Sequence, residues 1–261
     1  MLLGSLLLVA AWEFIWPRRR RHFPALRRRI ANIGFWLTNL VLAGLLLGPA
    51  ATARPRIEAV FGFNLPTWPL ADVSVSFVAG FLLLDVLQYA VHRCQHAVPW
   101  LWRLHALHHS DPDVDVTTSV RHHPIEYLIA SMMYWVAVLV VEIPAVVVMA
   151  HALTVFAAAA VTHGNIRMPI FLEQALRPLF ITLDLHRIHH SIDVIDANSN
   201  YGAVLSVWDR IFGTLRTHPA TPQKEMVFGV QELSPQEGIS PVKMVLTPWL
   251  LGKTRTALAD A

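Results

Sequence analysis

Apolar residues are gathered into long runs over the first 162 residues of the chain, and polar residues separate these runs. The runs cover residues 2–16, 30–50, 73–91 and 127–162. Two of them, 30–50 and 73–91, are long enough to cross a hydrocarbon core of about 30 Å as helices. Beyond residue 164 the sequence has no comparable run. The pattern predicts a helical membrane bundle followed by a region of short helices.

A proline divides the last apolar run. Glu142 and Pro144 lie near its middle, and proline removes a helical hydrogen bond and favours a bend. We therefore expect segments 127–141 and 143–162 to form a hairpin, whose first arm is short for a full span and is only partly inserted. The stretch 218–261 is rich in proline and is expected to be loop-like.

Arginines near the N-terminus predict the orientation of these segments. They lie between Arg18 and Arg29, and cytoplasmic flanks of membrane helices carry an excess of Lys and Arg. With these arginines in the cytoplasm, the second run crosses the membrane away from the cytoplasm and the third crosses back. His92, at the end of the third run, then lies at the cytoplasmic surface. The hairpin brings His163 to the same side. The expected fold is an all-α integral membrane bundle of about four to five membrane segments, with a cytoplasmic helical cap that carries the histidines.

The composition agrees with a membrane protein. Hydrophobic residues make up 54% of the chain and charged residues only 15%, whereas ordinary soluble domains carry about a quarter charged residues. The formal net charge is +3, but the arginines lie beside apolar segments, so nucleic acid is not an expected partner. Residues 1–16 lack the positive start of a cleaved signal peptide and are expected to form a retained membrane helix. The single cysteine excludes an intrachain disulfide and a multi-cysteine zinc site.

Histidines recur at helical spacing in three motifs: HRCQH, LHALHHS and LHRIHHS. Residues three or four apart share a helix face, and adjacent residues are turned by about 100°. One H-x-x-H-H helix can therefore reach two metal ions, or one ion from two directions. The eight histidines suit two ions with about four nitrogen ligands each, and such a set leaves iron an open position for oxygen. They are His92, His96, His105, His108, His109, His186, His189 and His190.

Other histidines have more than one interpretation. His163, in THGN, is a further metal candidate. His122 and His123 are adjacent in RHHPIE, and adjacent residues cannot share a helical face, so only one of them is expected to serve the site. His151 lies within an apolar run, where a hydrogen bond between helices is the expected role. The solvated surface is expected to hold His22 and His218.

Asp85 is a carboxylate within an apolar run. A charged group there is costly and marks a candidate functional residue. Asp85 shares one helical stripe with His92 and His96. It either holds the second ring nitrogen of a ligand histidine or makes a structural hydrogen bond between helices. The sequence leaves both roles open.

Together these motifs resemble the sterol desaturase/fatty acid hydroxylase superfamily. The likeness runs through DVLQYAVHRCQH, WRLHALHHSDPDVDVTTSVRHHPIE, THGN, LHRIHHS and NYGAVLSVWDRIFGTLR, which cover roughly residues 80–217. The resemblance implies an integral membrane enzyme with a non-haem di-iron centre held by histidines. In RHHPIE the family pattern R-x-H-P falls on His123 rather than His122. The implied metal residues are His92, His96, His105, His108, His109, His123, His163, His186, His189 and His190.

The resemblance also implies roles beside the metal ligands. Arg121 and Glu126 look like structural partners, and Trp208 lies in the closing motif that is expected to pack beneath the histidines. The candidate catalytic residues are Asp85, Asn200, Tyr201 and Asp209. The implied domains are N-terminal membrane segments at 1–79, a catalytic domain at 80–217 and a C-terminal tail at 218–261.

The implied activity is O2-dependent hydroxylation or desaturation of a lipid or sterol-like substrate. Two iron ions are the expected cofactors, and electrons are expected from a separate donor protein of the ferredoxin, cytochrome b5 or reductase type. The first histidine motif fits a bacterial branch, which suggests the inner membrane with the active site facing the cytoplasm. Two alternatives remain: a zinc hydrolase, although the chain has no H-E-x-x-H, and a metal carrier, although the histidines lie at the ends of the spans.

Overall fold

The computed structural model describes residues 2–47, 53–64 and 72–251, and this part of the chain is helical, with three isolated β-bridges and no strand. The longer helices are α1 (Leu2–Ile15), α2 (Ala25–Leu47), α3 (Ala53–Phe61), α4 (Val73–Ala97), α5 (Pro99–His109), α6 (Pro124–Val141) and α7 (Ala145–His163). The shorter ones are η2 (Val116–Val120), α8 (Ile170–Leu176), α9 (Leu183–His189), α10 (Val194–Ala197), α11 (Val207–Ile211), α12 (Pro235–Ile239), α13 (Pro241–Val245) and α14 (Thr247–Leu250). The all-α expectation is confirmed.

Two helices of the described chain, α4 and α7, are long and apolar enough to cross a membrane. Only 28% of the apolar window of α4 and 22% of that of α7 is buried, so most of these side chains are at least partly accessible at the surface. An apolar helix with so much accessible surface suits a lipid environment better than water. The full number of spans, four to five, and the cytoplasmic side of the cap remain predictions.

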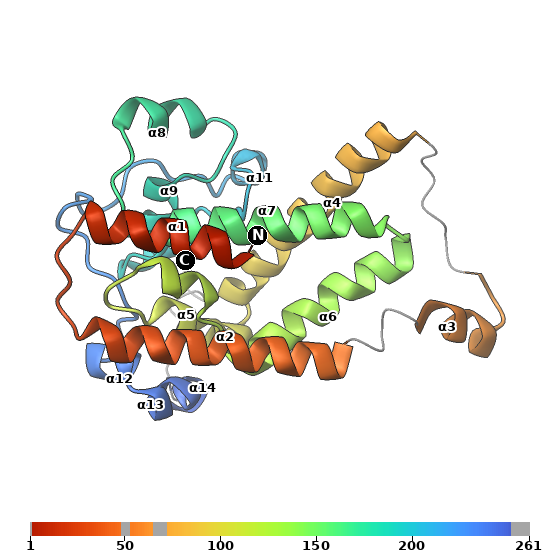
Figure 1. The fold of residues 1–261 in the computed structure, drawn as a ribbon, viewed down its shortest axis with the longest axis horizontal. Coiled ribbons are helices and arrows are strands. Elements are labelled where there is room, and N and C mark those ends of the chain that lie inside the picture. Colours follow the sequence, from red (N-terminus) through yellow and green to blue (C-terminus); the bar gives the residue numbers. More distant parts are fainter. Residues whose placement is uncertain (1, 48–52, 65–71, 252–261) are drawn as a thin grey trace.

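The predicted break in the last apolar run is confirmed. Helix α6 ends at Val141, and α7 begins at Ala145 with Pro144 as its N-cap residue. Between them Glu142 has a φ of 57°, a left-handed conformation that reverses the chain within a few residues. The two helices meet at one end of the molecule, and the short helices of the cap gather around the other half (Figure 1).

A second proline turn sets the direction of the chain beside the first histidine motif. Val98 ends α4 and has extended backbone angles, and Pro99 occupies the first turn of α5. Proline is favoured at that position because its missing N–H has no partner in the first turn. The last turns of α4 and the whole of α5 therefore form adjoining helices, and each carries histidines.

Helix α1 is part of the packed core. Val9 packs with Val116, Ala160 and Leu183, which come from η2, α7 and α9. The buried carboxylate of Glu13 accepts hydrogen bonds from the backbone N–H groups of Val116 (2.7 Å) and Asn165 (2.8 Å). The first apolar run thus holds together two loops that lead into the histidine motifs.

The expectation of a loop-like tail after residue 218 differs from the structure, which has three short helices between 235 and 250. Pro235, Pro241 and Pro248 each lie in the first turn of one of these helices, where proline starts a helix rather than breaking it. Ser234 and Glu237 add a capping box to α12. Proline content alone does not distinguish a loop from a series of helix starts.

Gly238 of α12 gives a test of this packing. A Cβ atom at Gly238 would lie 2.1 Å from the backbone oxygen of Ser110, so Gly238→Ala must displace backbone and is expected to destabilise the protein by about 1–3 kcal/mol. Gly34 in α2 has open space around it, so Gly34→Ala is the matched control and is expected to stabilise by about 0.5–1 kcal/mol. Thermal unfolding of the detergent-solubilised variants measures both. Equal stabilities for the two variants would contradict the tight contact.

Candidate metal centre

Nine histidines form two neighbouring groups, and within each group the ligand atoms all lie within 4.8 Å of one another. The five-histidine group comprises His92, His96, His105, His109 and His189. The four-histidine group comprises His108, His163, His186 and His190. The structure therefore brings together nine of the ten histidines that the sequence assigned to metal, from four separate segments of the chain.

The two H-x-x-H-H motifs divide their histidines between the two groups in opposite ways. On α5 the i, i+4 pair His105 and His109 belongs to the five-histidine group, and His108 belongs to the other. On α9 and its C-cap residue the i, i+4 pair His186 and His190 belongs to the four-histidine group, and His189 belongs to the other. Each motif thus contributes to both groups, because its third histidine is turned away from the i, i+4 pair.

The distances between ring nitrogens suit bound ions. Nε2 of His189 lies 3.0 Å from Nε2 of His92, and Nε2 of His186 lies 2.9 Å from Nε2 of His163. Metal–nitrogen distances of about 2.0–2.1 Å place neighbouring ligand nitrogens roughly 2.9–3.4 Å apart. In the five-histidine group, other buried Nε2 atoms have no hydrogen-bond partner within the described residues: those of His96, His105 and His109. The side chains present therefore fit two metal ions.

Six of the nine outer ring nitrogens have a hydrogen-bond partner, whereas those of His109, His186 and His190 have none within the described residues. Nδ1 of His92 lies 2.8 Å from the backbone oxygen of Tyr201, and Nδ1 of His189 lies 2.7 Å from that of Ser199. Nδ1 of His105 lies 2.7 Å from Oε1 of Glu126. A proton on Nδ1 leaves the lone pair of Nε2 directed inward, and partners of this kind fix the orientation of metal-binding rings.

Burial keeps five of the histidines outside the long apolar helices neutral. Burial, followed by the proximity of other histidines, lowers the pKa of each of them well below its usual range. Neutral imidazole is the form that binds a metal ion. These residues are His108, His109, His186, His189 and His190.

His123 lies outside both groups. Its Nε2 atom lies 3.2 Å from the backbone oxygen of Val245, and its Nδ1 atom accepts a hydrogen bond from the N–H of Ile125. Neither nitrogen is left for a metal ion. His122 instead stacks on His108, with ring centroids 4.7 Å apart, and places Nδ1 3.3 Å from Glu126. Of the adjacent pair, His122 is the residue that faces the centre.

Asp85 does not contact a ligand histidine. Its carboxylate accepts hydrogen bonds from Nε1 of Trp208 (2.8 Å) and from the N–H of Leu205 (3.3 Å), and it lies 3.5 Å from Nε2 of His151. These contacts join α4 to α7 and to the closing motif. Of the two roles left open by the sequence, the geometry corresponds to the structural hydrogen bond between helices.

The other three candidate catalytic residues shape the loop after α10. Asp209 accepts hydrogen bonds from the N–H groups of Tyr201 (2.8 Å) and Gly202 (2.9 Å). The Asn200 side chain bonds the backbone oxygens of Leu185 and Arg216. This loop places the Tyr201 carbonyl beside His92, and the Tyr201 ring lies 5.1 Å from the ring of His96. Tyr201 lies beside the histidine groups, whereas Asn200 and Asp209 hold the loop in its conformation through hydrogen bonds.

A cavity of about 340 Å³ adjoins both histidine groups. His105 and His108 contribute to its wall, together with apolar side chains of α2, α6 and α7, among them Trp36, Trp135 and Phe156. Polar side chains such as Gln88, His122 and Glu126 also line it. Along α7 it extends from His163 to His151, a distance of about 18 Å at 1.5 Å per residue. The volume suits part of one lipid chain rather than a whole two-chain lipid.

Two neighbours of the centre were not identified from the sequence. Trp102 lies beside an apolar segment, and such an aromatic residue suggests an anchor at the membrane interface. In the structure, however, the ring of Trp102 lies 5.0 Å from the ring of His96 and 5.5 Å from that of His109. Gln88 lines the large cavity. The sequence feature that could have identified Gln88 is a polar residue within an apolar run, one helical turn before His92.

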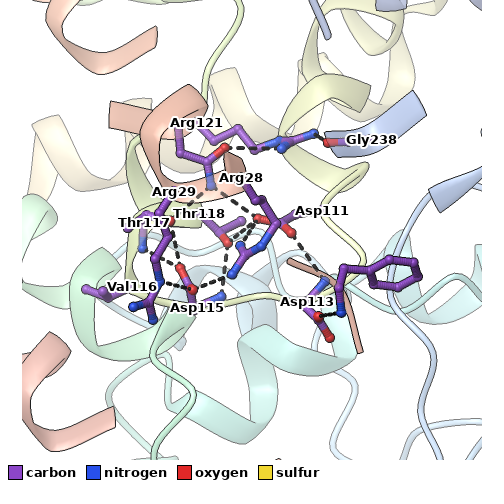
Figure 2. A network of polar contacts seen from close by, with 12 residues as sticks. Arg28, Arg29, Asp111, Asp113, Asp115, Val116, Thr117, Thr118, Arg121 and Gly238 are labelled. Carbon is purple, nitrogen blue, oxygen red and sulfur yellow. Dashed lines mark hydrogen bonds and ion pairs between the residues drawn. The ribbon is translucent and has the colours of Figure 1, made fainter. Parts of the chain in front are cut away.

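A buried polar network lies behind α5 (Figure 2). Arg28 binds Asp111 (2.7 Å) and Asp115, and Arg29 also binds Asp115 (2.8 Å). Arg121 donates to the backbone oxygens of Leu107 (2.8 Å) and Gly238 (2.5 Å). The network joins α2, the end of α5, η2 and α12, and so fixes the helix that supplies three of the nine histidines.

Charge pairing sets the ionisation of this network. Burial raises the pKa of Asp115, but the charges of Arg28 and Arg29 outweigh burial and hold it at about 2. Burial lowers the pKa of Arg121 to about 10, so this guanidinium is still charged at neutral pH. Buried ions of both signs are tolerated because each is hydrogen-bonded.

The comparison with known proteins agrees with this centre. The model of the fatty acid hydroxylase family, described as "Fatty acid hydroxylase", matches residues 77–214. That range contains all nine grouped histidines. No solved structure matches the chain significantly.

Several curated proteins are similar to this chain. Ornithine lipid hydroxylase OlsE of Rhizobium tropici is 32% identical over 65% of this chain and 50% of the relative. Alkylglycerol monooxygenase of Xenopus tropicalis is 31% identical over 56% of this chain and 31% of the relative. Lathosterol oxidase of Mus musculus is 28% identical over 56% of this chain and 46% of the relative. The chain spans half or less of the length of each of these relatives.

The pKa of Asp115 predicts an acid-dependent loss of stability. Since the pKa is about 2 in the folded protein and about 3.9 when unfolded, the ionised carboxylate contributes on the order of 2 kcal/mol above pH 4, and this is lost as the pH falls toward 2. Asp115→Asn is therefore expected to be less stable than the natural chain at pH 6, with the difference shrinking toward pH 2. Chemical unfolding at a series of pH values measures it.

Glu225→Gln is the control for this series, because Glu225 is exposed. Its stability is expected to follow that of the natural chain at every pH. A constant difference between Asp115→Asn and the natural chain from pH 6 to pH 2 would contradict the assigned charge pairing.

Proposed function

The chain belongs to the fatty acid hydroxylase family, within the sterol desaturase/fatty acid hydroxylase superfamily, and from this premise we propose that it is a membrane-bound non-haem di-iron oxidoreductase that uses O2 to hydroxylate or desaturate a lipid or sterol-like substrate. The observation that carries the proposal is the pair of buried histidine groups beside a largely apolar cavity. The relatives named as hydroxylase, monooxygenase and oxidase support the same class of reaction.

The nine grouped histidines would hold two iron ions, five ligands serving one ion and four the other. Neutral imidazole is a suitable ligand for iron, and the four-histidine set leaves a position open for oxygen. When bound, the two ions supply the activation of O2 that attack on an unactivated C–H bond requires. His122 and His123 are not assigned as ligands in this proposal.

The protein contributes orientation and exclusion of water. The cavity walls from α2, α6 and α7 are apolar near Trp36, Trp135 and Phe156, so a hydrocarbon chain replaces water there favourably. His105 and His108 lie in the same wall, which brings a C–H bond of that chain beside the metal-binding rings. Glu126 holds the ring of His105, and the Arg121 carbonyl holds that of His108, while substrate enters and product leaves.

Hydroxylation consumes one O2, two electrons and two protons per C–H bond and yields an alcohol and one water. We propose that a separate protein of the ferredoxin, cytochrome b5 or reductase type supplies the electrons. Trp102 supports an approach from the cap side, since it contacts the five-histidine group and lines a small cavity of about 40 Å³ together with Asn198. The proposed location is the bacterial inner membrane, with the centre on the cytoplasmic side, supported by the arginines from Arg18 to Arg29.

Metal content tests the two-ion proposal. The protein expressed with iron is expected to contain two iron ions per chain. His96→Ala and His190→Ala each remove one ligand from a different group, so each variant is expected to lose about one ion. Elemental analysis of purified protein measures this. His218→Ala is the control, because His218 is exposed, and it is expected to retain both. Zinc in place of iron, together with O2-independent hydrolysis, would favour a zinc hydrolase instead.

Oxygen incorporation tests the reaction. Cells that express the chain under 18O2 are expected to accumulate lipids with one added 18O atom, or lipids with one new double bond. Comparative mass spectrometry of lipid extracts detects both. His108→Ala is expected to abolish the new products. Identical lipids in cells with the iron-loaded natural chain and in cells without it would contradict the proposed function.

A further inference from the structure

Gln88 lies in the wall of the large cavity, close to the metal-binding rings. It is four residues before His92 on α4, so the two side chains lie on the same helix face, about 6 Å apart along the axis. It also lies within a helix that is apolar enough to cross a membrane. A carboxamide at this depth is costly unless it has a hydrogen-bonding partner.

Three other polar side chains near Gln88 on α4 have partners in the protein. Asp85 binds Trp208, the Tyr89 hydroxyl lies 2.9 Å from that of Thr214, and Gln95 donates to Glu126 (3.1 Å). Gln88 has no hydrogen-bond partner within the described residues. Its position in the cavity wall directs an unused donor and an unused acceptor toward the space that a substrate would fill.

A second polar group lines the same cavity. His122 is only partly buried, and its Nδ1 atom lies near Glu126. With a proton on Nδ1, its Nε2 atom is an acceptor, and that atom has no partner within the part of the chain that the structure describes. The end of the cavity near the metal centre therefore offers hydrogen bonds, whereas the walls at Trp135 and Phe156 are apolar.

We propose that Gln88 is a specificity-determining residue that binds an oxygen atom of the substrate within a few bonds of the carbon that reacts. The inference rests on the proposed function, and it narrows the substrate class to lipids with a hydroxyl, ether, ester or amide oxygen near the reactive position. A plain hydrocarbon segment would leave the Gln88 amide unpaired and would bind more weakly. An oxygen one helical turn from His92 would also fix which C–H bond faces the centre.

A binding experiment tests this without turnover. The metal-loaded protein in detergent binds the fluorescent fatty acid cis-parinaric acid, and chain-matched competitors, 1-tetradecanol, methyl tridecyl ether and tetradecane, displace it. The measured quantity is the preference for each oxygenated chain over tetradecane. Gln88→Met keeps the side-chain length and removes the amide, so it is expected to lower this preference by about three- to tenfold. Comparing two proteins cancels the partitioning of the competitors into micelles.

Thr154→Val is the matched control. Thr154 lies on the exposed face of α7 and bonds only the backbone oxygen of Ala150 (2.8 Å), so the control also removes a polar group from an apolar helix. Its preference for oxygenated chains is expected to equal that of the natural chain. Gln88→Met is expected to have an unchanged or higher unfolding temperature, because no partner within the protein is lost. Gln88→Asn keeps a shortened amide and is expected to retain part of the preference.

The outcomes separate this inference from the proposed function. An equal preference in the natural chain and Gln88→Met, or binding of all three chains with no preference in the natural chain, would overturn the role of Gln88. A lower unfolding temperature of Gln88→Met with an unchanged preference would do so as well and would show a structural role. A reduced preference in Gln88→Met, combined with neither added 18O nor a new double bond in the lipids, would support recognition of the oxygen and reject the proposed hydroxylase or desaturase.

Discussion

The structure depends on one constraint: nine imidazoles must meet with their inner nitrogens about 3 Å apart. Lone pairs at that distance repel one another unless a cation lies among them, so hydrogen bonds to the outer nitrogens are needed to hold rings in place. Carbonyl groups of Tyr201 and Ser199 and the carboxylate of Glu126 provide three of these bonds. The loop after α10 and the start of α6 must therefore be in position for the centre to form.

The opposite use of the two H-x-x-H-H motifs makes the centre a single unit. A displacement of α5 would move His105 and His109 in one group and His108 in the other. This explains why α5 is fixed so firmly from behind. Arg121 binds the carbonyl of Leu107 and reaches Gly238, while Arg28 joins α2 to the loop after α5. The C-terminal helices, far from the histidines in sequence, thereby support the position of the rings.

Polar side chains of α4 also bond segments that are distant in the sequence, here at the membrane end of the bundle. Asp85 and Tyr89 are buried, and each is bonded to a residue of the closing motif, residues 200–216: Asp85 to Trp208 and Tyr89 to Thr214. These contacts join the apolar helices to the cap and so set the width of the cavity between them. Gln88 is the nearby exception, and it faces the cavity. Asp85 and Tyr89 are thus bonded to other parts of the protein, whereas Gln88 is available to a ligand.

The sequence by itself determined the helical class, the bend at Pro144 and the family, because helical periodicity, proline turns and histidine spacing are local properties of the chain. It also identified eight of the nine grouped histidines, since i, i+3 and i, i+4 spacing places their rings on common faces, and it named His163 in THGN as a further candidate. Only the tertiary structure decided how these rings divide between two groups, that His122 rather than His123 faces the centre, and that Asp85 bonds Trp208. Those outcomes depend on contacts between separate segments of the chain, 23 residues apart for His163 and His186 and 123 apart for Asp85 and Trp208. No local pattern specifies which atoms meet across such distances.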